Sequence, residues 1–353
     1  MSDPSLPRPV AADTVTVAWD ASAYRALARP ADGDVEAVRT AARDAADAER
    51  AAGRTPVASP YALWPLLAEA LEPEPDEDAP KSVRKRAAMS PEAASAPARR
   101  AVLARMALVA CVAHCTPPAL PGEVAAVIDW EDEVAANAKA IVPQPLMLED
   151  PESALVVVAG GKIPKDHATF NLYLASTAAD LAADPTAARA KRLAGPLDHI
   201  RERATLIEGD FADEMQDAIV AAYEAAADAW DDSIGVAERQ RQVAKGTALL
   251  ERAVLGGRAA RAESLGGANP SASAPRIQER CADGLALWRE VVGAVVRSEI
   301  ELEGSAWRRS LWGLQLGFMT GVSPRTVVSA DPVLLDAARR AKLGDRILAV
   351  GER

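Results

Sequence analysis

Acidic side chains recur along residues 209–232 and form the densest group of candidate metal ligands in the chain. Carboxylates one helical turn apart can hold Mg²⁺ or Ca²⁺, because both cations prefer oxygen ligands. Such a site would belong to an enzyme that uses a carboxylate-bound divalent cation. The competing interpretation, which the charge pattern favours, is the solvated face of an amphipathic helix. The candidate ligands are Asp213, Asp217, Asp228, Asp231 and Asp232.

A second group combines two thiols with an imidazole in the pattern Cys111-x-x-His114-Cys115. Thiolates and imidazole nitrogens are the ligands that Zn²⁺ prefers. A structural zinc site needs a fourth ligand, and the remaining cysteine and histidines are distant in sequence. The segment Arg99–Cys115 is apolar almost all round, which predicts a buried helix whose cysteines pack in the core.

A third segment holds the residues that we consider for acid–base chemistry. Gly160-Gly161-Lys162 has the outline of an anion-binding loop, although neither the P-loop nor the dinucleotide-binding glycine pattern occurs. His167 follows closely and is the first choice for a general base, because histidine titrates near neutral pH. Lys162 and His167 are therefore the candidate catalytic residues, with an ordinary loop of solvated cations as the competing interpretation.

Two tryptophans flank a pair of arginines near the C-terminus. Residues five apart do not share a narrow helix face, so one indole is expected in the core and the other near the surface. Exposed tryptophan and arginine are enriched where proteins bind one another. The candidate partner-binding residues are Trp307, Arg308, Arg309 and Trp312. Burial of both indoles is the alternative.

The composition argues against several classes of function. The formal net charge of −11 opposes broad binding to a phosphate backbone, leaving local basic patches such as Lys81–Arg86. The three cysteines do not make a disulfide framework, and the N-terminal residues show no signal-peptide pattern. No stretch of about 18 or more apolar residues predicts a membrane span. We therefore expect a cytoplasmic protein whose partners are other proteins, with no membrane contact.

Helix signals outnumber strand signals, because roughly a fifth of the residues are alanine, the best helix former, and only 4% are aromatic. Asp34 and Asp331-Pro332 are typical helix starts, and further helices are expected at Pro121–Ile141 and Gly235–Gly256. Gly161–Thr169 is a predicted loop, and Gly195-Pro196 is expected to separate a helix at Thr186–Ala194 from one at Leu197–Ile207. Thr14–Asp20 alternates and is one of very few strand signals, while residues 154–160 and the C-terminal RILAV segment fit either a strand or a helix. We predict an all-α fold, an irregular multi-helix bundle of about ten to twelve helices with at most one or two short strands.

Composition changes divide the chain into helical segments and linkers. Residues 73–98 combine opposite charge blocks with proline, and residues 256–275 are rich in glycine, serine and alanine, so both are predicted linkers. The predicted order is a flexible tail at 1–13, an N-terminal helical segment at 14–72, a linker at 73–98, a central helical domain at 99–255, a linker at 256–275, and a C-terminal helical segment at 276–353 that packs on the central domain.

These observations predict a non-catalytic helical adaptor or scaffold of a bacterial cytosolic multi-protein system, acting through protein–protein contacts. No catalytic motif is recognised and only three histidines occur, while the Trp–Arg segment offers contact residues. No cofactor is expected for such an adaptor. The alternative is an all-α enzyme with Mg²⁺ bound by the acidic cluster, and nucleic-acid binding ranks third. The sequence indicates neither the identity of the partner nor the oligomeric state.

Overall fold

The chain, seen in a computed structural model, divides into two compact units that alternate along the sequence. Unit 1 combines Met1–Thr14, Tyr24–Leu148 and Leu172–Ala204, and unit 2 combines Val15–Ala23, Glu149–Asn171 and Thr205–Arg353. The structure describes residues 15–31, 33–71, 91–116, 155–156, 165–229, 277–296, 305–321 and 326–351. Within these ranges it describes only the backbone of residues 91–97, 165–168, 221–229, 296 and 305–309.

The fold is not all-α, because four short strands belong to one sheet in the order β2-β1-β3-β4. The strands are β1 (Val15–Trp19), β2 (Arg54–Val57), β3 (Thr326–Ser329) and β4 (Ile347–Ala349). The prediction of at most one or two short strands was therefore wrong, although the strand expected at Thr14–Asp20 is present as β1. The other strands have three or four residues each, which is too short to show a period, and every residue of β3 is buried, so β3 lacks polar–apolar alternation.

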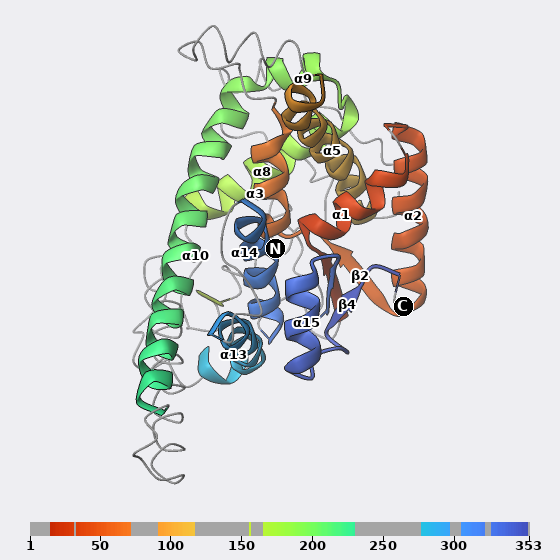
Figure 1. Cartoon of the computed structure of the whole chain (residues 1–353). Helices are drawn as coiled ribbons and strands as arrows, with labels where there is room; N and C mark the ends of the chain where they lie inside the picture. The colour runs from red at the N-terminus through yellow and green to blue at the C-terminus, as the bar shows by residue number, and fades with distance from the viewer. Residues whose placement is uncertain are drawn as a thin grey trace, which may run out of the picture. The chain divides into compact units, whose positions relative to one another are not determined.

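Unit 2 contains two parallel strand pairs with helices packed on them. β1 pairs with β3 and β3 pairs with β4, with Val17 opposite Thr326 and Val327 opposite Ile347. Helix α14 contacts β3, and helix α15 lies beside β4 (Figure 1). Parallel neighbours need crossover connections, which helices commonly supply. The helices of this unit that pack on one another are α13 (Ala282–Val296), α14 (Ser305–Phe318) and α15 (Pro332–Arg340).

Helices α13 and α14 approach each other closely at a glycine. A Cβ atom at Gly284 would lie 2.1 Å from the carbonyl oxygen of Phe318, so only glycine fits there without a backbone shift. One turn along α13, Trp288 meets the Phe318 ring edge to face, with ring centroids 5.9 Å apart. Both aromatic residues are fully buried and form a large part of the core of unit 2.

Unit 1 is built around helix α5 (Pro91–Cys115), against which α2 (Val35–Ala51) and α3 (Pro60–Ala70) pack. From Ala104 onward α5 is buried almost continuously, which agrees with the buried helix expected at Arg99–Cys115. Its first turns begin inside the segment predicted as a linker. Helix α3 contains Pro65 without ending there.

Three further helices follow along the chain, namely α8 (Lys165–Ala183), α9 (Ala187–Arg192) and α10 (Ala194–Ala229). Two features differ from the sequence prediction. The residues from Lys165 to Thr169 belong to the start of α8 rather than to a loop. Two helices are present on either side of Leu193, as α9 and the start of α10, but the break comes before Gly195-Pro196. This pair lies in the first turn of α10, because the first turn tolerates a residue without an N–H group.

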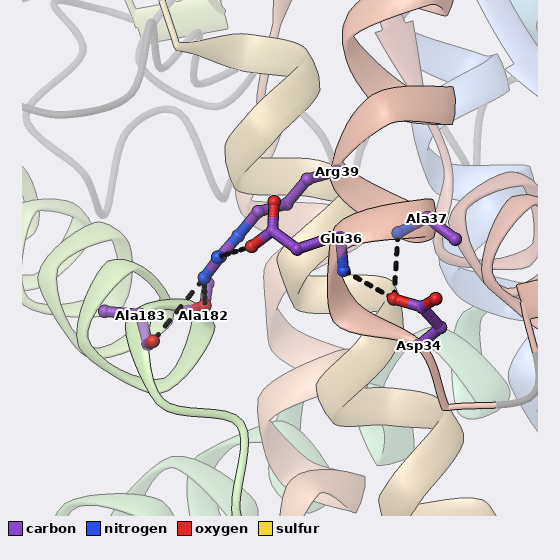
Figure 2. A network of polar contacts seen from close by, with 6 residues as sticks. All are labelled: Asp34, Glu36, Ala37, Arg39, Ala182 and Ala183. Carbon is purple, nitrogen blue, oxygen red and sulfur yellow. Dashed lines mark hydrogen bonds and ion pairs between the residues drawn. The ribbon is translucent and has the colours of Figure 1, made fainter.

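Hydrogen bonds fix the start of α2 and reach the end of α8 (Figure 2). The Asp34 carboxylate accepts hydrogen bonds from two backbone N–H groups at 3.0 and 3.1 Å, as the predicted helix cap requires. Arg39 pairs with Glu36 at 2.5 Å and donates to the carbonyl oxygens of Ala182 and Ala183 at 3.1 and 3.5 Å. These carbonyls end α8, so Arg39 supplies donors that a helix C-terminus otherwise lacks.

Some predicted elements lie outside the described residues, namely the helices expected at Pro121–Ile141 and Gly235–Gly256 and most of residues 154–160. Among the helices that are described, none combines the length and the apolar character needed to cross a membrane.

Candidate functional site

The carboxyl ends of β1 and β3 bring together three polar side chains of unit 2, which we call the Asp20 cluster: Asp20, Ser22 and Ser329. Asp20 follows β1 and precedes α1 (Ala21–Ala28), and Ser329 ends β3. The Ser329 hydroxyl donates to Asp20 Oδ2 at 2.6 Å, while the Ser22 hydroxyl and the Ala23 N–H donate to Oδ1 at 2.6 and 2.8 Å. Open α/β sheets generally bind ligands at this edge.

Burial raises the pKa of the Asp20 carboxyl above its usual value, because the charged form loses its hydration. Hydrogen bonds from Ser22, Ser329 and the Ala23 backbone act in the opposite direction, and the charge of Asp331 adds to the raise. A carboxyl group with a raised pKa exchanges its proton closer to neutral pH than an ordinary aspartate does. The Asp20 cluster therefore has the chemistry of an acid–base group.

The surroundings of Asp20 also show a structural role. Asp331 caps α15, with Oδ1 accepting the N–H of Val333 at 2.8 Å, and its own N–H donates to Ser329 Oγ at 3.0 Å. A Cβ atom at Gly313 of α14 would lie 2.9 Å from Asp20 Oδ2, so α14 closes over the carboxylate. Only 3% of Asp20 is exposed as a result. The Asp20 cluster thus connects the ends of β1 and β3 with α1, α14 and α15, which is a structural role that requires no reaction.

A more accessible candidate is the outward side of α10. Five of its residues follow one another at spacings of four, three, four and three, and a heptad spacing of this kind places them on one helix face. We call them the outer stripe: Leu206, Asp210, Asp213, Asp217 and Val220. All five are exposed, and Leu206 exposes 70% of its surface and Val220 44%. The residues buried on the other side include Ala204, Phe211, Met215, Ala218 and Ile219.

The outer stripe accounts for two of the predicted metal ligands, Asp213 and Asp217, which lie in the exposed part of α10. Asp228 lies in the last turns of α10, where only the backbone is described, and Asp231 and Asp232 lie outside the described residues. Over the part of the chain that is described, no group of three or more His, Cys, Asp or Glu residues is arranged to hold a metal ion.

The predicted partner-binding segment lies on α14, and its second indole faces the interior. Trp312 is only 2% exposed, donates from Nε1 to Glu208 at 3.2 Å and meets the Phe211 ring edge to face at 5.3 Å. Trp312 is therefore a core residue, and it anchors the inner side of α10. Trp307, Arg308 and Arg309 are helical, but their side chains lie outside the described set.

The structure does not describe the side chains of the two predicted catalytic residues. Lys162 lies outside them, and His167 falls in the first turn of α8, where only the backbone is described. Their roles stay predictions.

The Cys111-x-x-His114-Cys115 motif lies in the last two turns of α5 and meets a tyrosine that the sequence analysis missed. The Tyr24 hydroxyl lies 3.1 Å from His114 Nδ1 and 3.2 Å from Cys115 Sγ, and these two atoms are 3.6 Å apart. Tyr24 comes from α1, 90 residues before His114, so no local pattern could associate them. All of these side chains belong to unit 1 and are buried, as expected for the motif.

The Asp20 cluster, unlike Tyr24, had signals in the sequence that pointed to it. Asp20 follows directly on the one alternating apolar run, and Ser329 stands two residues before the helix cap Asp331. Open α/β sheets bind ligands outside the carboxyl ends of their strands, and a helix cap soon after a strand marks such an end. Because the sequence predicts an all-α fold, Asp20 and Ser329 are not recognised as the ends of two neighbouring strands.

Comparison with known proteins gives no family for the chain: no family model matches it, and neither a curated protein nor a solved structure is significantly similar to it.

Proposed function

We propose that this protein is a non-catalytic adaptor of a bacterial cytosolic multi-protein system, and that it binds a partner protein through the outer stripe of α10. The observation that supports this proposal is the exposure of Leu206 and Val220 at the two ends of one helix face. A single exposed apolar residue is ordinary, but two of them in heptad register match the contact pattern of a second helix.

The charges between the two apolar residues define the chemistry of the partner. Asp210, Asp213 and Asp217 lie one turn apart, and like charges at this spacing repel each other by about 0.2–0.5 kcal/mol per pair. A partner helix with lysine or arginine opposite them would relieve this repulsion and supply complementary charge. The partner surface is therefore an amphipathic helix with a basic centre and apolar residues at both ends.

A synthetic peptide tests the proposal directly. The probe is a helical 21-residue peptide with lysines and arginines in the middle of one heptad stripe and leucines at its ends, compared by calorimetry with a peptide that carries glutamate instead. We expect the basic peptide to bind and its Kd to rise about tenfold in Leu206→Ser and in Asp213→Lys, which is about 1.4 kcal/mol each. Asp345→Lys is the matched control, because it makes the same charge change at an exposed turn of the same unit.

Two results would overturn the proposal. One is equal binding of the basic and acidic peptides, and the other is an equal loss of binding in Asp213→Lys and Asp345→Lys. Equal binding of the two peptides would show that the aspartates of the outer stripe do not select the partner. An equal loss of binding in the two variants would show that net charge, and not the outer stripe, governs association.

A second candidate function is an enzyme with a carboxylate-bound Mg²⁺ ion, now centred on the carboxyl edge of the sheet. The parallel strands favour it, because this edge is where α/β folds bind ligands and Asp20 and Asp331 follow adjacent strands. Mg²⁺ is commonly held by one or two carboxylates together with substrate phosphates. A rise in melting temperature with Mg²⁺ that is lost in Asp331→Asn would support this enzyme, and an equal rise in both proteins would exclude it.

A further inference from the structure

The last turn of α5 and helix α1 form a buried site of thiol, imidazole and phenol groups, which we call the Tyr24 cluster: Tyr24, Cys111, His114 and Cys115. Each of the four residues is at most 1% exposed. The Tyr24 hydroxyl, His114 Nδ1 and Cys115 Sγ make a triangle with sides of 3.1, 3.2 and 3.6 Å. The Tyr24 hydroxyl and the His114 imidazole thus both contact Cys115 Sγ, away from bulk water.

The groups around Cys115 favour its thiolate form. Burial raises the pKa of the Cys115 thiol, but hydrogen bonds with Cys111, His114 and Tyr24 outweigh burial and lower the pKa to about 5. The pKa of Cys111 is raised well above its usual value, first by its hydrogen bond to Cys115 and then by burial. Of the two thiols, Cys111 therefore keeps its proton and Cys115 is the one that loses it.

One influence opposes the thiolate form of Cys115, which makes the neighbouring donors essential. The carbonyl groups at the C-terminus of α5 disfavour a negative charge in the last turn. Burial raises the pKa of the Tyr24 hydroxyl, which keeps this hydroxyl protonated and able to donate to the sulfur. The low pKa of the Cys115 thiol therefore depends on the neighbouring side chains of Cys111, His114 and Tyr24.

We propose that Cys115 and Cys111 are a redox-active pair, in which the Cys115 thiolate reacts with hydrogen peroxide and the product condenses with Cys111 to a disulfide. Hydrogen peroxide is small and uncharged, and Thr116, the residue next to Cys115 in the chain, is exposed. The proposal is independent of partner binding by α10.

The chemistry balances in two steps. Cys115 Sγ attacks one peroxide oxygen, the O–O bond breaks, and hydroxide leaves, which gives a sulfenic acid at Cys115. Cys111 Sγ then attacks Cys115 Sγ, the S–O bond breaks, and a second hydroxide leaves as the disulfide forms. One hydroxide takes the proton that the Cys111 thiol releases, and the other takes a proton from solvent. Two sulfurs lose two electrons and peroxide is reduced to two water molecules.

The helical spacing of the two cysteines permits the disulfide. Residues four apart in an α-helix have Cα atoms about 6.2 Å apart, within the range of about 4.4–6.8 Å found in disulfides. Their Cβ atoms are about 5–6 Å apart and must approach to about 3.8 Å, so the backbone has to tighten. Helix α5 ends at Cys115, so the adjustment falls on the terminal turn and not on the helix interior.

The test follows oxidation of each cysteine in the reduced full-length protein by one equivalent of hydrogen peroxide, with alkylation and peptide mass spectrometry. We expect a Cys111–Cys115 disulfide, and a Cys115 oxidation rate that changes less than about twofold between pH 6 and pH 8. The third cysteine, Cys281, is an internal control that is equally buried and lies in unit 2. An ordinary thiol has a pKa near about 8.5, so its rate rises about tenfold per pH unit in this range.

Variants distinguish the effect of each neighbouring group on Cys115 from a general loss of folding. In Cys111→Ser we expect the sulfenic acid to persist and to be trapped by dimedone. In Tyr24→Phe the rate at Cys115 should fall at pH 6 and become pH-dependent, while Tyr61→Phe, which removes another buried hydroxyl of unit 1, should behave like the parent protein. If Tyr24→Phe fails to fold, the pH profile of the unmodified chain decides.

The proposal fails if Cys115 and Cys281 oxidise at the same rate with the same pH dependence. It also fails if Cys115 becomes oxidised in the unmodified protein without pairing with Cys111.

Discussion

Removal of the Ser329 hydroxyl should destabilise unit 2, and the loss should grow with rising pH. In Ser329→Ala, Asp20 Oδ2 loses a donor at 2.6 Å inside the protein, and the Asp331 N–H loses its acceptor at 3.0 Å. The remaining bonds to Asp20 come from Ser22 and Ala23. The substitution removes one hydroxyl group and leaves the side-chain volume almost unchanged, so packing contributes little.

The magnitude depends on the charge of Asp20. A hydrogen bond to a charged group contributes about 1.5–3 kcal/mol to stability and a neutral one about 0.5–1.5 kcal/mol. The Ser329 hydrogen bond lowers the pKa of Asp20, which means that it stabilises the ionised form more than the protonated form. Ser329→Ala should therefore cost about 2 kcal/mol above the raised pKa of Asp20 and about 1 kcal/mol below it.

The sign of the pH dependence follows from the raised pKa of Asp20. The folded protein holds this proton to higher pH than the unfolded chain, so the stability due to Asp20 is complete at low pH. It falls as the pH rises through the folded pKa. Without Ser329 the pKa of Asp20 rises further, and this decline becomes larger. Asp20→Asn, which cannot ionise, should abolish the decline.

Urea unfolding followed by tryptophan fluorescence between pH 4 and pH 9 measures these differences. Ser310→Ala is the control, because Ser310 is a buried serine on α14 in the same unit. Its effect should be the same at every pH. A cost of Ser329→Ala that is below 0.5 kcal/mol, or one that does not change with pH, would refute the role assigned to the Asp20 cluster.

Further substitutions test three other parts of the fold. Gly284→Ala places a Cβ atom 2.1 Å from a backbone carbonyl oxygen at the end of α14, so it should lower the free energy of unfolding in urea by about 1–3 kcal/mol. Gly209→Ala in α10 meets nothing within 4 Å and should raise this free energy by up to about 1 kcal/mol. Arg54→Met leaves the fully buried carboxylate of Glu49 without the arginine 2.5 Å away, so it should lower stability by about 3–5 kcal/mol, and adding Glu49→Gln should recover most of the loss. Lys342, which follows α15, has a φ of 60°. Lys342→Gly should therefore stabilise the protein by about 0.5–1 kcal/mol and raise its melting temperature, and a lower melting temperature would contradict the left-handed turn.

Local signals in the sequence predicted much of the helical structure. The caps at Asp34 and Asp331 are present, with hydrogen bonds to the helix N–H groups, because a cap depends only on its next three residues. The buried helix before Cys115 and the amphipathic pattern through Phe211 and Met215 were also visible, since helical periodicity extends over many residues.

The sheet and the two side-chain clusters could not be predicted in the same way, because they depend on contacts across long stretches of chain. β3 and β4 have four and three residues, and their partners are set by tertiary pairing and not by local propensity. Tyr24 meets Cys115 from another helix, and Ser329 meets Asp20 from another strand. Local patterns along a single sequence do not show that two such residues meet.

The pairing of β1 with β3 has a consequence for biosynthesis. Asp20 and Ser329 are 309 residues apart, and at about 5–20 residues per second the ribosome needs roughly 15–60 s to make the chain between them. Closing a loop of this length costs about 5 kcal/mol of chain entropy. Unit 1 is complete once Ala204 has emerged, so it can fold while the rest is translated. The apolar strand β1 has to wait for β3, its neighbour within unit 2, and the folding of unit 2 is post-translational although its first strand is made early.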